Sequence, residues 1–160
     1  MRALIPAILS LVTVTACGGG TSAPTAPTPN PSGTLTSLSG TWAGPSSDTS
    51  GPETMTWTLT QNGNAMTGTM NISDSGRSMM GNGSLQGTVN GSTITFHMAV
   101  PNGGFSGMMS SCSMSADGQA QMSDDGHTMT GTYSGTMSGM MSQMQSCGGA
   151  MSNGRFTLTR

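Results

Sequence analysis

Gly40-Thr41-Trp42 opens the first segment of this chain that alternates like a β-strand, and Phe156-Thr157-Leu158-Thr159-Arg160 ends the chain with a matching pattern. A period of two places successive side chains on opposite faces of a strand. If these two segments pair with each other, a sheet built from the intervening chain closes on itself. The stretch around Trp42 therefore predicts a closed barrel.

Six further segments between these two share the alternating pattern. The clearest is Thr54–Thr60, where Met55, Trp57 and Leu59 occupy one face and threonine, which suits a solvated strand face, occupies the other. The weakest lies around Cys112–Met122. The remaining four are Met66–Ile72, Leu85–Val89, Ile94–Val100 and Met129–Gly135. Eight strands are therefore expected.

Tight turns are predicted at Asn62-Gly63, Asn90-Gly91, Asp125-Gly126 and Asn153-Gly154, because these residues tolerate positive φ. Short connections make strands that are adjacent in sequence adjacent in space. The prediction is an all-β protein with an eight-stranded antiparallel up-and-down β-barrel, and a β-sandwich is the alternative. At this size a barrel interior is either filled by side chains or holds one small ligand.

Composition narrows the possible partners and the nature of the core. The net charge is −2, with four arginines, no lysine and no basic stripe, so we expect no nucleic-acid partner. Aromatic residues make up only 4% of the chain, whereas methionine occurs 17 times. Much of the core must therefore be methionine. Nothing in the sequence calls for a cofactor.

Residues 1–17 have the pattern of a secretion signal, with Arg2 as the basic start and an apolar run too short to span a bilayer. The run ends in Val14-Thr15-Ala16-Cys17, which resembles the bacterial lipobox. That resemblance implies a lipoprotein whose Cys17 carries acyl chains such as palmitate, and Gly18 in the next position implies the outer membrane. An ordinary signal peptide with a chance cysteine is the alternative.

Residues 18–34 are rich in Pro, Thr, Ser and Gly, and alternating prolines hold such a chain extended. We interpret this segment as a tether, followed by the barrel domain at residues 35–160. The sequence thus predicts a protein of the cell envelope that is held to the membrane by an N-terminal lipid anchor.

Leu38-Ser39-Gly40-Thr41-Trp42 resembles the G-x-W strand that opens lipocalin and avidin barrels, the calycin type. In that group a basic residue on the last strand packs across the tryptophan, a role that the resemblance assigns to Arg160. Avidin's biotin-stacking tryptophans have no counterpart after Trp57, so biotin binding is not implied. The resemblance extends to architecture alone.

The predicted connections alternate between the two ends of the barrel and differ in length. Three short turns share one end, while long links at roughly residues 44–52, 73–83, 101–111 and 136–152 share the other. Loops gathered on a rigid scaffold are common places for binding residues. The end with the long links is therefore the expected mouth.

Cys112 and Cys147 lie within or beside two of these long links, and they are the only cysteines besides Cys17. In an exported protein a disulfide is the expected pairing. Closing this loop would stabilise the fold by about 3 to 4 kcal/mol. A metal-binding or redox thiol pair is the alternative, although the C-x-x-C spacing is absent.

Methionine is concentrated at the predicted mouth. Thioether sulfur is a soft ligand that selects copper(I), while the three- and four-residue spacings from Met137 to Met144 also suit one face of a short helical lid. A packed plug, an adaptable apolar ligand site, a copper(I) site and reversible methionine oxidation all remain open. The ligand or soft-metal candidates are Met108, Met109, Met137, Met140, Met141 and Met144.

Catalytic motifs are not evident. His97 is expected to point outward from its strand, His127 sits at a turn away from the mouth, and Asp48, Glu53 and Asp74 appear as scattered loop acids. General acid-base chemistry needs convergent titratable groups, so we expect no enzyme. Two functions remain: a lipid-anchored barrel whose mouth binds a small apolar or soft ligand, and a structural or surface-interaction lipoprotein with a packed barrel.

Overall fold

The structure, a computed structural model, describes residues 37–74, 76, 79–140 and 146–160, all within one compact unit, Thr34–Arg160. Cys17 and the predicted signal and tether lie outside the described residues. Among those described, no helix has the length and apolar character that crossing a membrane requires.

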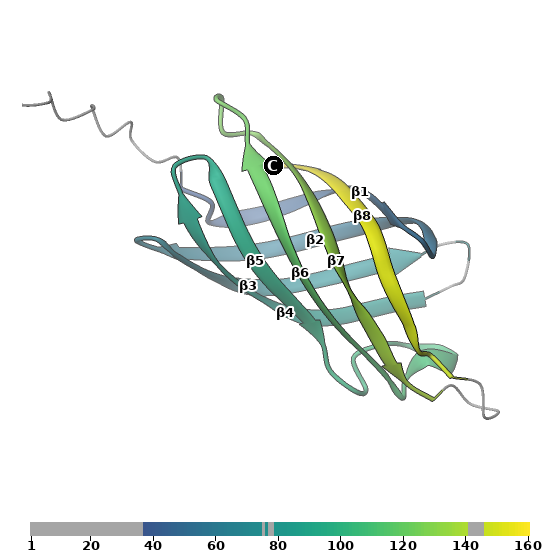
Figure 1. Ribbon diagram of the computed structural model, residues 1–160. Coiled ribbons are helices and arrows are strands. Elements are labelled where there is room, and N and C mark those ends of the chain that lie inside the picture. Colours follow the sequence, from purple (N-terminus) through teal and green to yellow (C-terminus); the bar gives the residue numbers. More distant parts are fainter. Residues whose placement is uncertain (1–36, 75, 77–78, 141–145) are drawn as a thin grey trace, which may run out of the picture. The chain divides into compact units, whose positions relative to one another are not determined.

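Eight antiparallel strands form a closed barrel in which each strand pairs with its neighbours in sequence and β1 pairs with β8 (Figure 1). The up-and-down order confirms the predicted fold, is compatible with a calycin-type barrel and rules out the β-sandwich. A 3-10 turn, Gly107–Met109, precedes β6. The strands are β1 Gly40–Asp48, β2 Gly51–Asn62, β3 Ala65–Asp74, β4 Met79–Asn90, β5 Thr93–Val100, β6 Cys112–Met122, β7 Thr128–Gly139 and β8 Gly149–Thr159.

Closure occurs where the first and last strands were expected to meet. Ala43 pairs with Thr159 and Ser46 with Phe156. The Arg160 guanidinium lies 4.8 Å from the centre of the Trp42 ring, as the resemblance implied, and donates a 2.6 Å hydrogen bond to the carbonyl of Ser37. The Trp42 indole N–H in turn donates to the Leu38 carbonyl at 2.8 Å. These contacts close one end of the barrel.

Several strands are longer than predicted. The expected link over residues 44–52 is only a turn at Thr49-Ser50, and β7 and β8 extend well into the expected link over residues 136–152. Apolar alternation ends early in these strands because polar residues such as Ser46 and Glu53 face inward near the mouth. Asn153-Gly154 is not a turn: it lies inside β8, where Asn153 has a φ of 58° beside a register shift opposite Tyr133 and Gly135.

The barrel interior is filled rather than hollow. Trp57 packs against Phe96 and Phe156 with ring centres 5.0 and 4.9 Å apart, and Tyr133 stacks on Phe156. Methionine supplies much of the remaining core, as the composition predicts. The buried methionines are Met55, Met66, Met70, Met79, Met98, Met114, Met122, Met129 and Met151.

Inward-facing glycines make room for the aromatic rings. Phe96 pairs across strands with Gly118 and Phe156 with Gly131, and each ring lies directly over its partner glycine. A Cβ atom on Gly118 would lie 2.3 Å from the Phe96 ring. Rings placed over cross-strand glycines let a narrow barrel hold large side chains.

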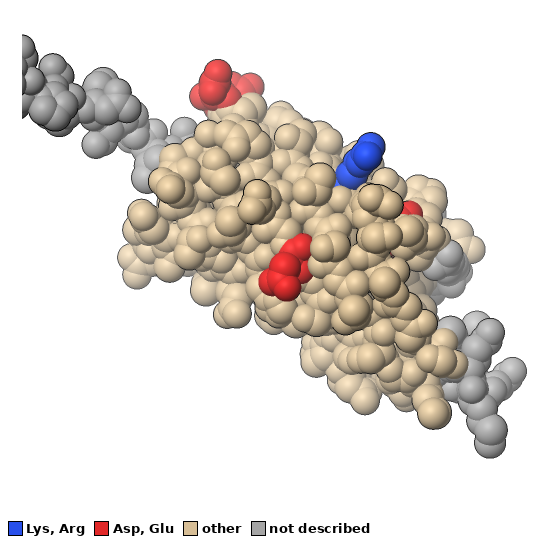
Figure 2. Space-filling view, in the orientation of Figure 1, with Lys and Arg blue, Asp and Glu red and all other residues tan. Residues whose placement is uncertain are grey.

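The outer wall is polar and carries little charge (Figure 2). Threonine and amide side chains bridge neighbouring strands, as in the 2.7 Å contact between the hydroxyls of Thr88 and Thr95 and the 2.9 Å bond between the Asn71 and Asn82 amides. His97 lies on this wall, as predicted, and its Nδ1 is 2.8 Å from Asp117 Oδ1.

Candidate functional site at the loop end of the barrel

The two ends of the barrel differ, as the sequence predicts. The turn end has the connections at residues 63–64, 91–92 and 123–127. The loop end has the connections at residues 49–50, 75–78, 101–111 and 140–148. The link between β1 and β2 is nevertheless short, so only three of the four loop-end connections are longer than two residues. The candidate site lies at the loop end.

Glu53 is the central polar group of this end. It points inward from β2, is half-buried, and its Oε1 accepts hydrogen bonds from the Tyr133 hydroxyl at 2.8 Å and the Ser46 hydroxyl at 2.9 Å. Burial raises the pKa of the Glu53 carboxyl, and the negative charges of Asp48 and Asp74 raise it further, against the lowering effect of the two hydrogen bonds.

Tyr133 and the neighbouring acids complete this polar group. Burial, reinforced by the Glu53 carboxylate, raises the pKa of Tyr133, so its phenol stays neutral and donates its proton to Glu53. Asp74 is buried and accepts the backbone N–H of Gly76 at 2.9 Å. The sequence interpretation of Asp48, Glu53 and Asp74 as scattered acids was wrong, because β1, β2 and β3 bring the three carboxylates within electrostatic reach of one another.

A small cavity lies beside Glu53. Its volume is about 20 Å³, enough for one water-sized molecule or ion. The polar part of its lining is Asp48, Ser50, Glu53 and Tyr133, and the apolar part is Ile72, Met79, Phe105, Met114, Met137 and Met151. Carboxylate, phenol and thioether groups therefore converge on a single small space.

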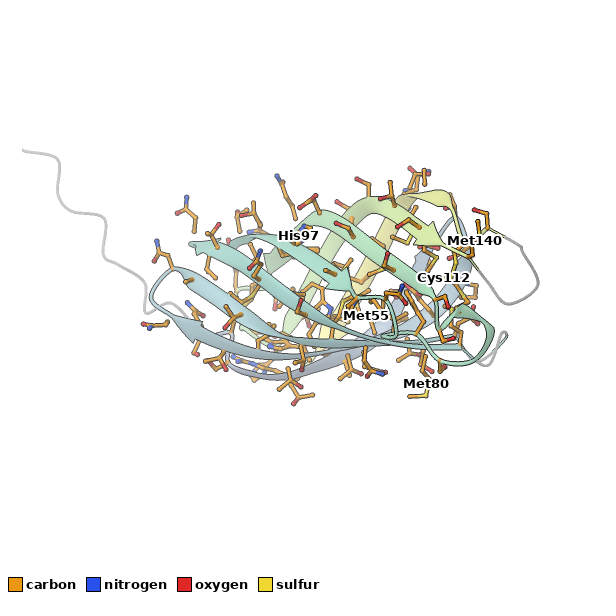
Figure 3. All side chains as sticks on the ribbon, turned by 90° about the horizontal axis from the view of Figure 1, so that it is seen from below. Met55, Met80, His97, Cys112 and Met140 are labelled. Carbon is orange, nitrogen blue, oxygen red and sulfur yellow. A yellow bond between two sulfur atoms is a disulfide. The ribbon has the colours of Figure 1, made fainter. Side chains whose placement is uncertain are left out.

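Of the six predicted methionines, Met109, Met137 and Met140 have described side chains, and these three do not form one cluster. Met137 lines the cavity, and Met109, at the end of the 3-10 turn, is half-buried against the core. Met140 is 67% exposed and pairs in a β-bridge with Ser146, away from the cavity lining (Figure 3). Met108 lies in the 3-10 turn, where its side chain is not described, and Met141 and Met144 fall outside the described residues.

The expected helical lid from Met137 to Met144 is wrong over its first part. β7 continues through Met137 to Gly139, and Met140 is also extended. Pairing with β6 and β8 outweighs the three- and four-residue methionine spacing, which Gly139 already weakens as a helix.

Sequence reasoning did not single out three cavity methionines as site residues. Met79 and Met151 lie at the expected mouth without belonging to the predicted candidates, and Met114 falls in the weakest of the predicted strands. Alternation from Cys112 through Met114 to Ala116 is the signal that places Met114 inward. Its proximity to Met137 depends on the pairing of β6 with β7.

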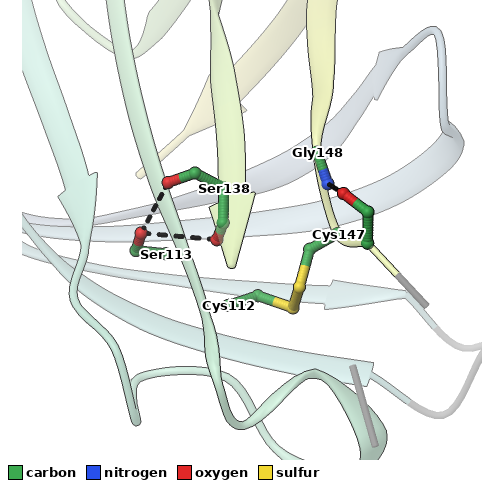
Figure 4. Close-up of a disulfide and its surroundings, with 6 residues drawn as sticks. Cys112, Ser113, Ser138, Cys147 and Gly148 are labelled. Carbon is green, nitrogen blue, oxygen red and sulfur yellow. Dashed lines mark hydrogen bonds between the residues drawn. A yellow bond between two sulfur atoms is a disulfide. The ribbon is translucent and has the colours of Figure 1, made fainter. Parts of the chain in front are cut away.

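A disulfide between Cys112 and Cys147 confirms the predicted pairing (Figure 4). It connects the first residue of β6 to the segment leading into β8, with a sequence separation of 35 residues. Beside it, the Ser113 and Ser138 hydroxyls are 3.0 Å apart across β6 and β7. The bond therefore connects β6, which carries Met114, to the segment that leads into β8, which carries Met151.

Within the part of the chain that the structure describes, no group of three or more His, Cys, Asp or Glu side chains is arranged to hold a metal ion. His97 and His127 stand apart, on the outer wall and at the turn between β6 and β7.

Comparisons with protein-family models, curated proteins and solved structures found no match for this chain.

Proposed function

We propose that this chain is a lipid-anchored protein of the bacterial cell envelope, in which a packed, non-catalytic barrel serves as a rigid scaffold and carries its interaction surface at the loop end. The proposed scaffold role rests on one observation, the filled interior of the barrel. Trp57, Phe96 and Phe156 occupy the middle of the barrel in mutual contact.

The alternative, a barrel that holds a small apolar ligand, needs more space than the interior offers. Pockets for such ligands enclose about 300 to 1,000 Å³. The cavity at the loop end holds about 20 Å³. An apolar ligand of ordinary size would have to displace Phe105 and the neighbouring methionines, so the packed scaffold is the better supported reading.

The anchor rests on the lipobox-like segment that ends at Cys17. The described chain begins at Ser37, which Arg160 holds at the turn end of the barrel. We infer that the tether enters at that end and that the loop end is directed away from the membrane, toward whatever partner the protein meets. Outer-membrane attachment follows from Gly18 by the same resemblance.

Replacing the proposed lipidation site tests the anchor. Cys17→Ser is expected to release the protein from membranes into the soluble fraction, as followed by fractionation of cells. The double variant Cys112→Ser/Cys147→Ser is the matched control, because it removes the other two cysteines and leaves Cys17 in place. Retention of Cys17→Ser in the membrane fraction would contradict the lipid anchor.

Native mass spectrometry of the protein purified from its own envelope tests the packed scaffold. We expect the barrel to carry no bound organic molecule, because aromatic rings and buried methionines of the described residues occupy the middle of the barrel. A reproducible lipid or other apolar adduct, lost on unfolding, would overturn the packed-scaffold reading and restore the ligand-binding alternative.

A further inference from the structure

Four methionines converge on the loop-end cavity from separate strands. Met114 on β6 and Met137 on β7 are direct cross-strand partners, and Met151 on β8 is one diagonal step from Met137, which pairs with Gly149. Directly opposed residues have Cβ atoms about 5 Å apart, and diagonal neighbours remain within reach of long side chains. Met79 on β4 lines the same cavity.

These thioethers surround a space of atomic size. Met79, Met114 and Met151 are buried, Met137 is half-buried, and the cavity has a volume of about 20 Å³. An organic ligand does not fit this volume, whereas one ion does. Thioether sulfur binds soft cations and has little affinity for hard ones such as Mg²⁺.

Glu53 brings a carboxylate to the same cavity. Both of its hydrogen bonds, from Tyr133 and Ser46, reach Oε1, and no ion pair connects Glu53 with Arg155 or Arg160, the two described arginines. A half-buried carboxylate is stabilised by a nearby positive charge. Asp48 lines the same cavity, so the carboxylates of this cavity favour a cation, while the neutral thioethers favour a soft one such as copper(I).

The disulfide restrains the strands that carry two of the four sulfur ligands, Met114 on β6 and Met151 on β8. Cys112 lies two residues before Met114, and Cys147 lies four residues before Met151. Both ends of the bond are buried. The bond therefore limits how far β6 and β8 can separate at the cavity, which favours a ligand set that is in place before the ion binds.

We propose that Met79, Met114, Met137 and Met151 form a binding site for one soft monovalent cation of the copper(I) or silver(I) class, with Glu53 as the counter-charge. This set shares only Met137 with the methionines singled out from the sequence. The site does not depend on the lipid anchor, so the two proposals fail separately.

Silver(I) is a suitable probe because it is soft, monovalent and stable in air. The full chain carrying Cys17→Ser is used, since its remaining cysteines are joined in the disulfide and no free thiol competes for the ion. Native mass spectrometry is expected to show one silver ion per chain, with a higher melting temperature, whereas Mg²⁺ should leave both unchanged.

Two double variants distinguish silver binding in the cavity from silver binding at exposed methionines. Met114→Leu/Met137→Leu keeps side-chain volume and is expected to abolish stoichiometric binding. Met80→Leu/Met140→Leu is the matched control, because these side chains are 49% and 67% exposed and do not line the cavity. Glu53→Gln should weaken binding by roughly tenfold, since it removes one unit of charge from a half-buried site.

Methyl resonances of ¹³C-labelled methionine provide a readout without any change to the cavity. Silver(I) should shift the resonances of the four cavity methionines and leave those of core residues such as Met66 and Met129 in place, so the test stands even if a variant fails to fold. The proposal is overturned by the absence of bound silver, by binding that survives Met114→Leu/Met137→Leu, or by equal loss in the exposed-methionine control.

Discussion

At the residue scale, the fold depends on inward-facing glycines, which have no side chain, as much as on the large side chains of the core. Gly118 and Gly131 face inward and are covered by the rings of Phe96 and Phe156. In the sequence these glycines look like gaps in an apolar alternation. In the barrel they are the positions over which aromatic rings lie, and this pairing explains how a narrow interior accommodates Trp57 as well.

Gly118→Ala is predicted to destabilise the fold by about 1 to 3 kcal/mol, because the added methyl group would overlap the Phe96 ring and the carbonyl of Thr132. Gly149→Ala is the matched control, since a Cβ atom there meets nothing within 4 Å. Urea unfolding of both variants measures the difference in free energy. Equal stabilities for the two variants would contradict the role assigned to the ring contacts.

At the element scale, the alternating patterns locate all eight strands, including the weak one at Cys112–Met122, but they misplace several ends. Strands continue past the last apolar residue wherever the partner strand continues, because backbone hydrogen bonds do not depend on side-chain polarity. The same pairing converts Asn153-Gly154 from an expected turn into an irregularity within β8. An Asn-Gly pair indicates positive φ, and positive φ serves bulges as well as turns.

Asn153→Ala is predicted to destabilise the barrel by about 1 kcal/mol, because alanine adopts the observed positive φ less readily than asparagine. Asn153→Gly should be neutral or nearly so, since glycine adopts that conformation without a steric cost. Thermal unfolding monitored by circular dichroism compares the two. A more stable alanine variant would show that the backbone at residue 153 relaxes to negative φ.

At the scale of the whole molecule, closure of β1 onto β8 separates two ends with different chemistry. The turn end is sealed by Leu38, Trp42 and Arg160, and the loop end carries the disulfide, the inward-facing acids and the cavity methionines. Residues up to 103 positions apart in sequence, Asp48 and Met151, line one cavity only because the sheet is closed.

Reduction of the Cys112–Cys147 disulfide is predicted to lower the free energy of unfolding by about 3 to 4 kcal/mol, because the unfolded chain regains the entropy of a loop that spans 35 residues. Denaturant titrations with and without reductant measure the change. Cys112→Ser/Cys147→Ser should be insensitive to reductant, and an unchanged wild-type midpoint would contradict the stabilisation assigned to the bond.

The Glu53 carboxyl predicts a specific pH dependence of stability. Its pKa in the folded protein is raised above the ordinary value of 4.5, so the folded state holds this proton more tightly than the unfolded state. The resulting stabilisation is fully present below about pH 4.5 and is lost as the pH rises through the higher folded pKa.

Glu53→Gln is expected to remove the loss of folding stability that accompanies rising pH. The variant should be more stable than the wild type at neutral pH, because its amide oxygen still accepts hydrogen bonds from Tyr133 and Ser46. Free energies of unfolding measured between pH 4 and pH 8 test this. Asp124→Asn, at the exposed turn between β6 and β7, is the control that should keep the wild-type slope. If the free energy of unfolding of Glu53→Gln changed with pH as in the wild type, Glu53 would be excluded as the source of the pH dependence.

The strand order, the all-β class, the closing pair of strands and the disulfide could be predicted from the sequence, and the Arg160–Trp42 contact from its resemblance to calycin-type barrels. These depend on local alternation, on turn residues, on the number of cysteines and on a short resembling motif, all of which can be read along the chain. The filled interior, and the meeting of Glu53, Tyr133 and four methionines at one end, could not be predicted from the sequence. Such contacts depend on the register between distant strands, because register determines which inward-facing side chains share the same level of the barrel.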